Sequence, residues 1–357
     1  MPLKPYLKRV IEDRATLTRE EARALLEQIL AGEMTDLQLA ALLGAIATRG
    51  ESPAEIAGFV DAMRAAATSI PLTEPERARL VDTCGTGADL SGTFNISTAA
   101  ALVAAAAGAT VAKHGNRAVT SQSGSADVLE ALGIPVGLSP AEAAEALRRH
   151  RFAFLHAPSL HPAMKTVMPV RRALGIRTIF HLVGPLSNPA GARAQIMGVY
   201  APRLVPIAAE AMRLLGTRHA FVVHGDIGPG TSGGSARGLG LDELSISGPS
   251  QIAEVRGATI TLHQLTPEQV GLSTALIDNL RGGDAAANAQ ILRAIFRGEP
   301  GPRRDIVLLN AAAVLITAGL VPSETDPYTA LRAGIALAAA TIDSGAVTAL
   351  VAALAAT

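Results

Sequence analysis

From Arg79 onward, short apolar segments typical of buried strands alternate with segments long enough to form a helix. The predicted strands cover residues 79–85, 109–115, 151–157, 194–201 and 218–225. Strands that alternate with helices usually pair in parallel, because each crossover helix brings the chain back to the same end of the sheet. The sequence therefore predicts an α/β fold with a mainly parallel central sheet flanked by helices, and ligands beyond the carboxyl ends of the strands.

The first 72 residues carry helix signals only. A hydroxyl side chain is followed three positions later by an acid or amide at three places, which are Thr18 with Glu21, Thr35 with Gln38, and Ser52 with Glu55. Each pair has the form of a capping box, which satisfies two free backbone donors at the start of a helix. Apolar residues recur at helical spacing after each box. We therefore expect a small all-helical domain ahead of a large α/β domain.

Charge and cysteine content restrict the partners and the compartment. The 357 residues hold 31 basic and 31 acidic side chains, so no general positive field would bind nucleic acid or an anionic membrane. The single cysteine fits a reducing cytoplasm, and the charged first residues do not resemble a secretory signal. The apolar span from Ile96 to Ala112 is mostly alanine and shorter than about 20 residues, so we expect a buried helix and strand there rather than a membrane anchor.

A glycine loop follows the first predicted strand. The segment Gly85-Thr86-Gly87-Ala88-Asp89 precedes Asn95-Ile96-Ser97-Thr98 at a predicted helix start. Glycines let a bulky anion approach the backbone, and the free N–H groups of a helix start point toward it. The segment is therefore a candidate phosphate-binding loop. Alone, such a loop is more often an ordinary turn with an N-cap.

The second predicted strand ends in Lys113-His114-Gly115-Asn116-Arg117, and Ser123-Gly124-Ser125 follows at another helix start. A run of such residues is usually a solvated surface. Here it follows a buried strand beside the first loop, in a chain with few charges. Together the two loops favour a polyphosphate site at one edge of the sheet.

Two further motifs lie later in the chain. His161, Lys165, Arg171 and Arg172 fall on a predicted helix, and Gly184-Pro185 follows in a predicted turn. An arginine fork suits a carboxylate ligand, although a single arginine is more often a surface residue. Asp242 and Glu243 follow the strand 218–225 and offer oxygen ligands for Mg²⁺, although an isolated pair is usually a solvated turn.

These motifs, in this order, resemble the anthranilate phosphoribosyltransferase family over nearly the whole chain. The segments that carry the resemblance are GTGAD with NIST, KHGNRAVTSQSGSADVLEALG, HPAMKTVMPVRRALGIRTIFHLVGPLSNPA and LDELS. The resemblance implies a fold like that of nucleoside phosphorylases and class II phosphoribosyltransferases. It also implies a transfer of the phosphoribosyl group from phosphoribosyl pyrophosphate to the amine of anthranilate, with release of pyrophosphate, in tryptophan biosynthesis.

The resemblance also assigns site residues and partners. Asp242 and Glu243, with Ser97, would hold Mg²⁺, with two ions expected, and the chain would form a cytoplasmic homodimer through the helical domain. That domain would comprise 1–72 with about 165–185, and the α/β domain 73–164 with 186–357. Phosphoribosyl pyrophosphate would be bound by Gly85, Ala88, Asp89, Thr93, Asn95, Ile96, Ser97, Thr98, Lys113 and Ser125. Anthranilate would be bound by Gly85, His114, Asn116, Arg171, Gly184 and Pro185.

Several positions depart from the family pattern. Ala88 stands where the family has glycine, so a methyl group would weaken pyrophosphate binding if this position requires a positive φ. Gln122 replaces a lysine, Leu160 replaces a histidine, and a glycine-rich insertion occupies 226–240. The insertion is typical of a surface loop, with a lid over the metal site as the alternative.

No general base is assigned from the sequence. The aromatic amine loses its proton readily once it is bonded to the ribose, and His114 is a candidate acceptor or a pocket wall. Two other functions share this architecture: a nucleoside phosphorylase, and a non-catalytic relative that binds nucleic acid. The first would not need Arg171 or the Asp242-Glu243 pair, and the second would be expected to show a basic face.

Overall fold

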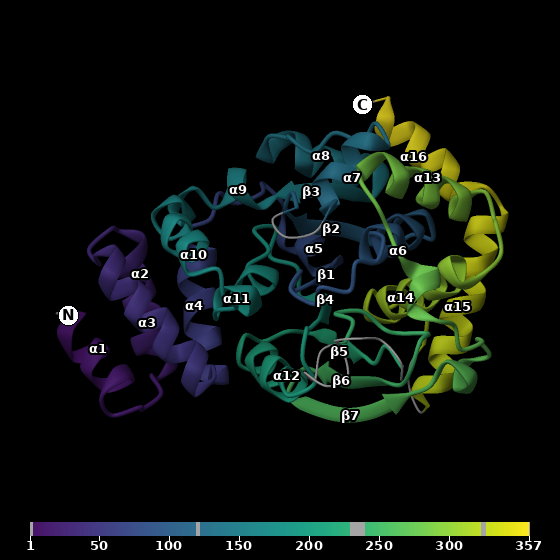
Figure 1. Ribbon diagram of the computed structural model, residues 1–357. Coiled ribbons are helices and arrows are strands. Elements are labelled where there is room, and N and C mark those ends of the chain that lie inside the picture. Colours follow the sequence, from purple (N-terminus) through teal and green to yellow (C-terminus); the bar gives the residue numbers. More distant parts are fainter. Residues whose placement is uncertain (1–2, 119–121, 229–239, 323–325, 357) are drawn as a thin grey trace.

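The computed structural model describes residues 3–118, 122–228, 240–322 and 326–356. Four helices form a bundle at the amino-terminal end, on one side of the sheet (Figure 1). Three of them open with the predicted capping boxes, each with both reciprocal hydrogen bonds. The helices are α1 (Leu3–Ile11), α2 (Arg19–Leu30), α3 (Asp36–Arg49) and α4 (Pro53–Ala65). The predicted helical domain is confirmed, and α1 is an additional helix that the capping pattern did not indicate.

A seven-stranded sheet forms the large domain, in the order β3-β2-β1-β4-β5-β6-β7. The first five strands pair in parallel and confirm the predicted ones. The strands are β1 (Leu80–Gly85), β2 (Thr110–Gly115), β3 (Phe152–His156), β4 (Ala194–Gly198), β5 (His219–Gly225), β6 (Ser250–Arg256) and β7 (Thr259–Leu265).

The start of the C-terminal third holds two strands beyond the five predicted ones. There β6 and β7 form a hairpin that extends the sheet in antiparallel pairing. The sequence carries a short signal for it, since apolar and polar residues alternate through 253–256 and 259–262 on either side of Gly257, whose φ is +56°.

Helices cover both faces of the sheet. The long α6 (Ile96–Ala106) and α14 (Pro302–Thr317) pack together over β1, β2, β4 and β5, whereas α8 (Pro140–His150) and α12 (Leu204–Leu214) lie on the opposite face. The apolar span therefore folds as α6 followed by β2, as predicted. Apart from the half-buried Ala106 and Ala107, its alanines are at most 4% exposed, and their small side chains let α6 pack close to α14 and the sheet.

The remaining α-helices follow the bundle along the chain. They are α5 (Glu74–Ala78), α7 (Ser125–Ala131), α9 (Ala157–Leu160), α10 (Met168–Leu174), α11 (Phe180–Leu186), α13 (Ala285–Phe296), α15 (Pro327–Asp343) and α16 (Ala346–Ala355). Among the described residues, no single helix has both the length and the apolar composition to cross a bilayer. The bent pair α15 and α16 passes that test jointly, on length and composition alone.

The segment that carries α10 and α11 lies between the helical bundle and the sheet (Figure 1). Val167, Val170 and Ile179 of this segment share a hydrophobic core with helices α2–α4. The same core continues to the sheet through Met197 and Val222. The two domains are therefore joined by continuous apolar packing, and the predicted boundaries at 72, 165 and 185 stay a prediction.

Candidate active site

Two glycines at the carboxyl ends of β1 and β4 allow the Asp242-Glu243 segment to lie directly against the sheet edge. A Cβ atom on Gly85 would lie 2.5 Å from the carboxyl carbon of Asp242, and one on Gly198 would overlap the Asp242 backbone. Only glycine leaves room for this approach. Gly85 and Asp242 are therefore in contact although they are far apart in the sequence. Their contact lies at the carboxyl ends of the parallel strands, where the sequence predicts the ligand site.

Asp242 is tied to the glycine loop after β1. Its Oδ2 accepts hydrogen bonds from the backbone N–H of Gly87 at 2.7 Å and from the hydroxyl of Thr86 at 2.9 Å. Its own backbone N–H donates to Oδ2 of Asp89 at 3.4 Å. Burial and the charges of Asp89 and Glu243 hold the pKa of the Asp242 carboxyl well above its usual range. A cation would relieve this concentration of negative charge.

Glu243 lies at the start of α6, beside a buried lysine. Its Oε1 accepts the backbone N–H of Ser97 at 3.1 Å, and burial raises its pKa to about 7, opposed by the charge of Lys113. The Lys113 Nζ donates to the Thr83 carbonyl at 2.6 Å and to the Ser97 hydroxyl at 3.3 Å. Lys113 is only 2% exposed. The structure therefore brings together Ser97, Lys113 and Glu243, three of the predicted residues.

Two other predicted residues lie just before α6. Thr93 forms an isolated bridge with Arg281. The Asn95 side chain donates to the Ser123 carbonyl at 3.1 Å and accepts from the Asn288 amide at 2.9 Å. Asn95 therefore holds the two phosphate-loop candidates together, and its amide is already engaged by the protein.

The side chains of Ile96 and Thr98 point into the core rather than toward the sheet edge. Each is 1% exposed, and the Thr98 hydroxyl has no hydrogen-bond partner within the described ranges. The Ile96 backbone N–H already donates to the Phe94 carbonyl at 2.8 Å, so a ligand at the start of α6 would meet the backbone N–H of Thr98 rather than these side chains.

The methyl group of Ala88 causes no backbone strain. Between β1 and α6 the residues with positive φ are Gly87, at +65°, Leu90, at +59°, and Gly92, at +69°, whereas Ala88 does not have a positive φ. The Ala88 methyl is 6% exposed and packs into the core shared with the helical bundle. Leu90, which no sequence pattern singled out, is the strained position, and its side chain is 70% exposed.

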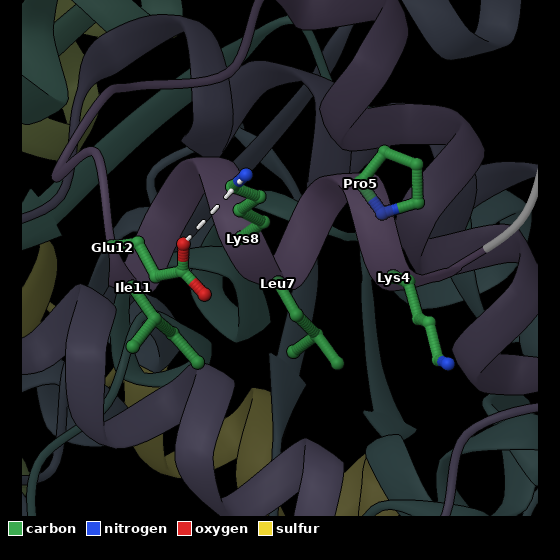
Figure 2. Close-up of a pocket in the computed structure, with 6 residues that line it drawn as sticks. All are labelled: Lys4, Pro5, Leu7, Lys8, Ile11 and Glu12. Atoms are coloured by element: carbon green, nitrogen blue, oxygen red, sulfur yellow. Dashed lines mark ion pairs between the residues drawn. The ribbon is translucent and has the colours of Figure 1, made fainter.

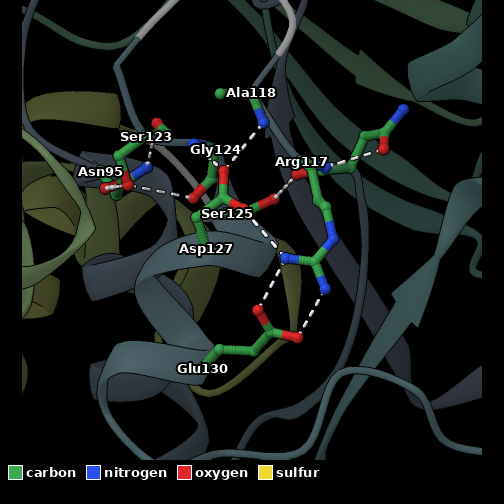
Figure 3. A network of polar contacts seen from close by, with 9 residues as sticks. Asn95, Arg117, Ala118, Ser123, Gly124, Ser125, Asp127 and Glu130 are labelled. Atoms are coloured by element: carbon green, nitrogen blue, oxygen red, sulfur yellow. Dashed lines mark hydrogen bonds and ion pairs between the residues drawn. The ribbon is translucent and has the colours of Figure 1, made fainter.

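Arg117, the last residue of the polar run after β2, is paired with acidic side chains of α7. Its guanidinium forms two bonds of 2.6 Å to Glu130 and one of 3.1 Å to Asp127 (Figure 3). Asp127 also accepts the backbone N–H groups of Ala118 and Gly124 at 2.9 Å each. This network closes the loop onto α7, and its ion pairs explain the cluster of charges.

Asn116 and Ser125 are brought together by the same loop. The Ser125 hydroxyl donates to the Asn116 carbonyl at 3.2 Å, and the backbone N–H of Arg117 donates to the Asn116 Oδ1 at 2.7 Å. A residue predicted to contact phosphoribosyl pyrophosphate therefore lies against one predicted to contact anthranilate.

His114 faces a second histidine, His161, and their ring centroids lie 5.1 Å apart. Burial and the nearby His161 lower the pKa of His114 to about 3, although a hydrogen bond to the Gly184 backbone opposes this shift. Burial also lowers the pKa of His161 to about 4. Both Nε2 atoms are buried without a partner within the described ranges. These two imidazoles are neutral near pH 7, and each has one ring nitrogen that bonds to no described protein group.

Arg171 stands on α10 without a carboxylate partner in the described part of the chain. Its guanidinium lies 5.3 Å from the centre of the Phe180 ring and 3.8 Å from the Met168 sulfur. Burial lowers the pKa of Arg171. The predicted turn at Gly184-Pro185 is wrong, because both residues lie in the last turn of α11. The Gly184 backbone nevertheless reaches His114.

Asp82 is a buried carboxylate that belongs to none of the sequence motifs. Its Oδ1 accepts the backbone N–H groups of Thr83 at 2.8 Å and His114 at 3.1 Å, and its Oδ2 accepts the Asn188 amide at 2.9 Å. Burial raises its pKa to about 6, while the Asn188 bond opposes the shift. An aspartate in the middle of a buried strand was the available signal.

The carboxylates fit a magnesium ion that is also held by substrate. Within the described ranges, no three His, Cys, Asp or Glu side chains are arranged to enclose a metal. The charge of Asp89 nevertheless raises the pKa values of both Asp242 and Glu243, as expected for closely placed negative groups. Mg²⁺ in phosphate-transfer sites commonly uses one or two carboxylates and completes its octahedron with water and phosphate oxygens. The oxygen donors present match that pattern.

The remaining departures lie at the margins of the site. Gln122 is exposed, and Leu160 is buried in a small core with α8. Residues 229–239, most of the glycine-rich insertion 226–240, lie outside the described residues. Just before them, β5 ends at Gly225, which pairs with Leu241 in an isolated bridge. Asp242 is therefore anchored to the sheet immediately after the insertion.

Comparison with known proteins matches both domains. A model of the glycosyl transferase family, a/b domain, covers residues 77–348, and one of its helical bundle domain covers 4–67. An anthranilate phosphoribosyltransferase of Symbiobacterium thermophilum is 48% identical over 96% of this chain and 94% of its own length. The enzyme of Methanosarcina acetivorans is 45% identical over 96% of this chain and 86% of its own.

Solved structures of the same enzyme share the fold. The anthranilate phosphoribosyltransferase of Thermus thermophilus has a TM-score of 0.87 and 41% identity, with 98% of each chain covered. The Saccharomyces cerevisiae enzyme, in complex with phosphoribosyl pyrophosphate and Mg, has a TM-score of 0.83 and 26% identity, with 98% of this chain and 96% of that chain covered.

Proposed function

We propose, from the premise that this chain belongs to the anthranilate phosphoribosyltransferase family, that the edge of the sheet described above is its active site. The reaction transfers the phosphoribosyl group from phosphoribosyl pyrophosphate to the amine of anthranilate, a step of tryptophan biosynthesis. The observation that best supports this location is the meeting of Lys113, Ser97 and Glu243 at the start of α6. A cation, a helix start and a metal-compatible carboxylate lie together there.

The donor substrate is assigned to the loops after β1 and β2. The Thr98 backbone N–H at the start of α6 and the Lys113 ammonium would face the pyrophosphate, with Gly85 to Asp89 around it, because the N–H groups of Ile96 and Ser97 are engaged by Phe94 and Glu243. Ser125 completes this side near Asn116. Departure of pyrophosphate places negative charge on its oxygens, which these fixed donors stabilise without reorganising.

We assign Mg²⁺ to Asp242, Glu243 and Ser97, with two ions as the proposed number. When bound, the metal neutralises charge on the departing pyrophosphate and orients it. The raised pKa values of Asp242 and Glu243 support this assignment, because two buried carboxylates beside Asp89 lack sufficient positive charge from Lys113 alone.

The acceptor is assigned to the other side, between β2 and the α10–α11 segment. Arg171 offers its guanidinium fork to the anthranilate carboxylate, and Asn116 holds the amine side. His114, with Gly184 and Pro185, forms the wall. Because burial lowers the pKa of His114 to about 3, this histidine is a weak base, which supports a wall role over proton abstraction.

Catalysis then depends mainly on position. The aromatic amine must be held against the ribose carbon while water is kept out, because hydrolysis of the activated ribose competes with transfer. The helical domain and the α10–α11 segment move toward the sheet in this proposal and close the site.

We also propose a cytoplasmic homodimer that associates through the helical domain. A surface hollow of about 520 Å³ on α1 is lined by Lys4, Pro5, Leu7, Lys8, Ile11 and Glu12. Leu7 and Ile11 project from the same side of this helix (Figure 2), and Ile11 is 41% exposed. Leu7 is half-buried against the bundle, and covering the part of these apolar side chains that remains exposed by a second copy is favourable. Sedimentation velocity of the protein and of Ile11→Asp tests this: a single monomeric species in the unchanged chain contradicts the dimer.

The proposed function is tested with purified protein, anthranilate, phosphoribosyl pyrophosphate and Mg²⁺. We expect anthranilate fluorescence to disappear as pyrophosphate is released in equal amount. Omission of either donor or metal is the control. A folded protein that consumes no anthranilate under saturating conditions would contradict the function, and phosphorolysis of a nucleoside by the same sample would favour the phosphorylase alternative.

A further inference from the structure

Arg177 joins the helical segment to the glycine loop after β1. It lies in the connection between α10 and α11, and it donates from both Nε, at 3.0 Å, and Nη2 to the single carbonyl oxygen of Ala88. Its guanidinium carbon is 4.6 Å from the centre of the Tyr200 ring. A planar cation that is stacked on one side and forked onto a carbonyl has little rotational freedom.

The loop Gly87–Asp89 is therefore held from two directions. From the sheet, Asp242 accepts the Gly87 N–H and its own N–H donates to the Asp89 carboxylate. From the helical segment, Arg177 holds the carbonyl of Ala88, the residue between them. Because the loop is fixed from both sides, the backbone N–H groups of Ala88 and Asp89 keep one orientation.

The stacking partner is as firmly placed as the loop. Tyr200 is 4% exposed and belongs, with Ala88, to the hydrophobic core shared with the helical bundle. The Arg177 guanidinium has no carboxylate partner within the described ranges, so the Ala88 carbonyl and the Tyr200 ring are its recorded contacts there. This arrangement uses the arginine to connect two parts of the chain rather than to balance a charge.

We infer that Arg177 is a positioning residue for the donor substrate: it fixes the Ala88 carbonyl and thereby the orientation of the Gly87–Asp89 loop. This inference rests on the proposed assignment of that loop to phosphoribosyl pyrophosphate. The same segment carries Arg171 six positions earlier, so the element proposed to hold anthranilate also orients the loop proposed to hold the donor.

The test is a steady-state comparison of KM for the two substrates. For Arg177→Ala we expect the KM for phosphoribosyl pyrophosphate to rise about 10-fold or more, as expected when a charged hydrogen bond is lost. The KM for anthranilate, measured at saturating donor, should change less than about threefold. A variant that only folds less well would lose kcat with both KM values unchanged, and that result would overturn the inference.

Conservative variants keep the test decisive if Arg177→Ala does not fold. Arg177→Lys keeps the charge but loses the fork, and Tyr200→Leu removes the stacking surface, so both should raise the donor KM in the same direction. Tyr200→Phe keeps the ring and should match the unchanged enzyme. Arg213→Ala removes a guanidinium that pairs with Glu210 on α12 and serves as the matched control.

The outcomes distinguish a failure of the proposed function from a failure of the role inferred for Arg177. The unchanged enzyme must first turn over anthranilate, and inactivity at that stage contradicts the proposed function rather than the role of Arg177. With an active enzyme, equal effects on both KM values overturn the inference. The inference is also overturned if Tyr200→Leu and Tyr200→Phe have the same KM for phosphoribosyl pyrophosphate.

Discussion

The two sides of the proposed site bury ionisable groups of opposite kinds, and burial shifts their pKa values in opposite directions. The carboxylate side, defined as Asp89, Asp242 and Glu243 with Lys113, concentrates negative charge, and burial raises the pKa values of Asp242 and Glu243. The histidine side, defined as His114, His161 and Arg171, contains two imidazoles whose pKa values burial lowers. Burial favours the neutral form on both sides, but only the carboxylates can regain their charge by binding a cation.

This difference indicates which kind of ligand each side suits. In the proposed function the carboxylate side holds Mg²⁺ and meets a ligand whose charge changes during the reaction. The histidine side offers neutral rings, an apolar wall and one guanidinium, which suits a flat aromatic acid. Separate variants on the two sides should therefore affect different substrates.

The largest effect is expected from Glu243→Gln on the carboxylate side. We expect kcat/KM for phosphoribosyl pyrophosphate to fall about 1,000-fold, because a metal supplies several kcal/mol of charge stabilisation. The Mg²⁺ concentration needed for half-maximal activity should rise as well, which a titration with anthranilate fluorescence measures. Glu210→Gln, on α12 beside Arg213, is the control. An unchanged Mg²⁺ dependence would remove Glu243 from the metal site.

On the histidine side, Arg171→Ala should raise the KM for anthranilate about 10- to 100-fold, since a charged hydrogen bond is worth about 1.5–3 kcal/mol. The KM for phosphoribosyl pyrophosphate should stay within about threefold. Arg171→Lys should recover only part of the loss, because it lacks the fork. Equal changes in both KM values would contradict the division of the site into two sides.

The pH dependence of stability should have opposite signs on the two sides. The folded pKa of His114, about 3, lies below its ordinary value of 6.5, so the unfolded chain takes up the proton first as pH falls. His114 therefore lowers the free energy of unfolding below pH 6.5. The folded pKa of Glu243, about 7, lies above its ordinary value of 4.5. Between these two values the folded state binds the proton more tightly, so Glu243 raises the free energy of unfolding as pH falls.

Urea unfolding in EDTA, at several values between pH 7 and 4.5, measures these slopes as differences from the unchanged chain. Relative to it, His114→Gln should gain up to about 1.4 kcal/mol for each pH unit below 6.5. Glu243→Gln should lose stability relative to the unchanged chain over the same interval. Parallel slopes for the two variants would mean that burial does not act oppositely on the two sides.

The sequence indicated the donor half of the site more completely than the acceptor half. Strand ends and helix starts are local features, so their patterns indicated Lys113 and Ser97 at one edge of the sheet, whereas the pairing of Glu243 with Ser97 was implied by the family resemblance. The meeting of Asp242 with Gly85 followed from the parallel sheet. The contact of His114 with His161 and the role of Arg177 depend on how α10 and α11 pack against the sheet, which no local pattern encodes.

The errors in prediction have physical causes as well. Gly184-Pro185 suggested a turn, yet the proline occurs in the last turn of α11. The β6–β7 hairpin was overlooked because alanine-rich helices dominate the end of the chain. Asp82 belongs to no motif, and only its hydrogen bonds to Thr83, His114 and Asn188 explain a carboxylate inside a strand.

The smallest effect is expected at Arg117. This residue lies in the same loop after β2 as Asn116 but is not one of the residues that define the carboxylate side. Its guanidinium is engaged by Asp127 and Glu130, and exposed ion pairs contribute little. Arg117→Ala should therefore change the KM for phosphoribosyl pyrophosphate less than about threefold. Asp127→Ala should have the larger effect of the two, because Asp127 also accepts the N–H groups of Ala118 and Gly124 and so shapes the loop. Lys113→Met, which removes the buried cation of the carboxylate side, is the comparison. If Arg117→Ala raises the KM for phosphoribosyl pyrophosphate as much as Lys113→Met does, Arg117 must leave Asp127 and Glu130 to bind the donor. The ion-paired network would then not be the substrate-bound state.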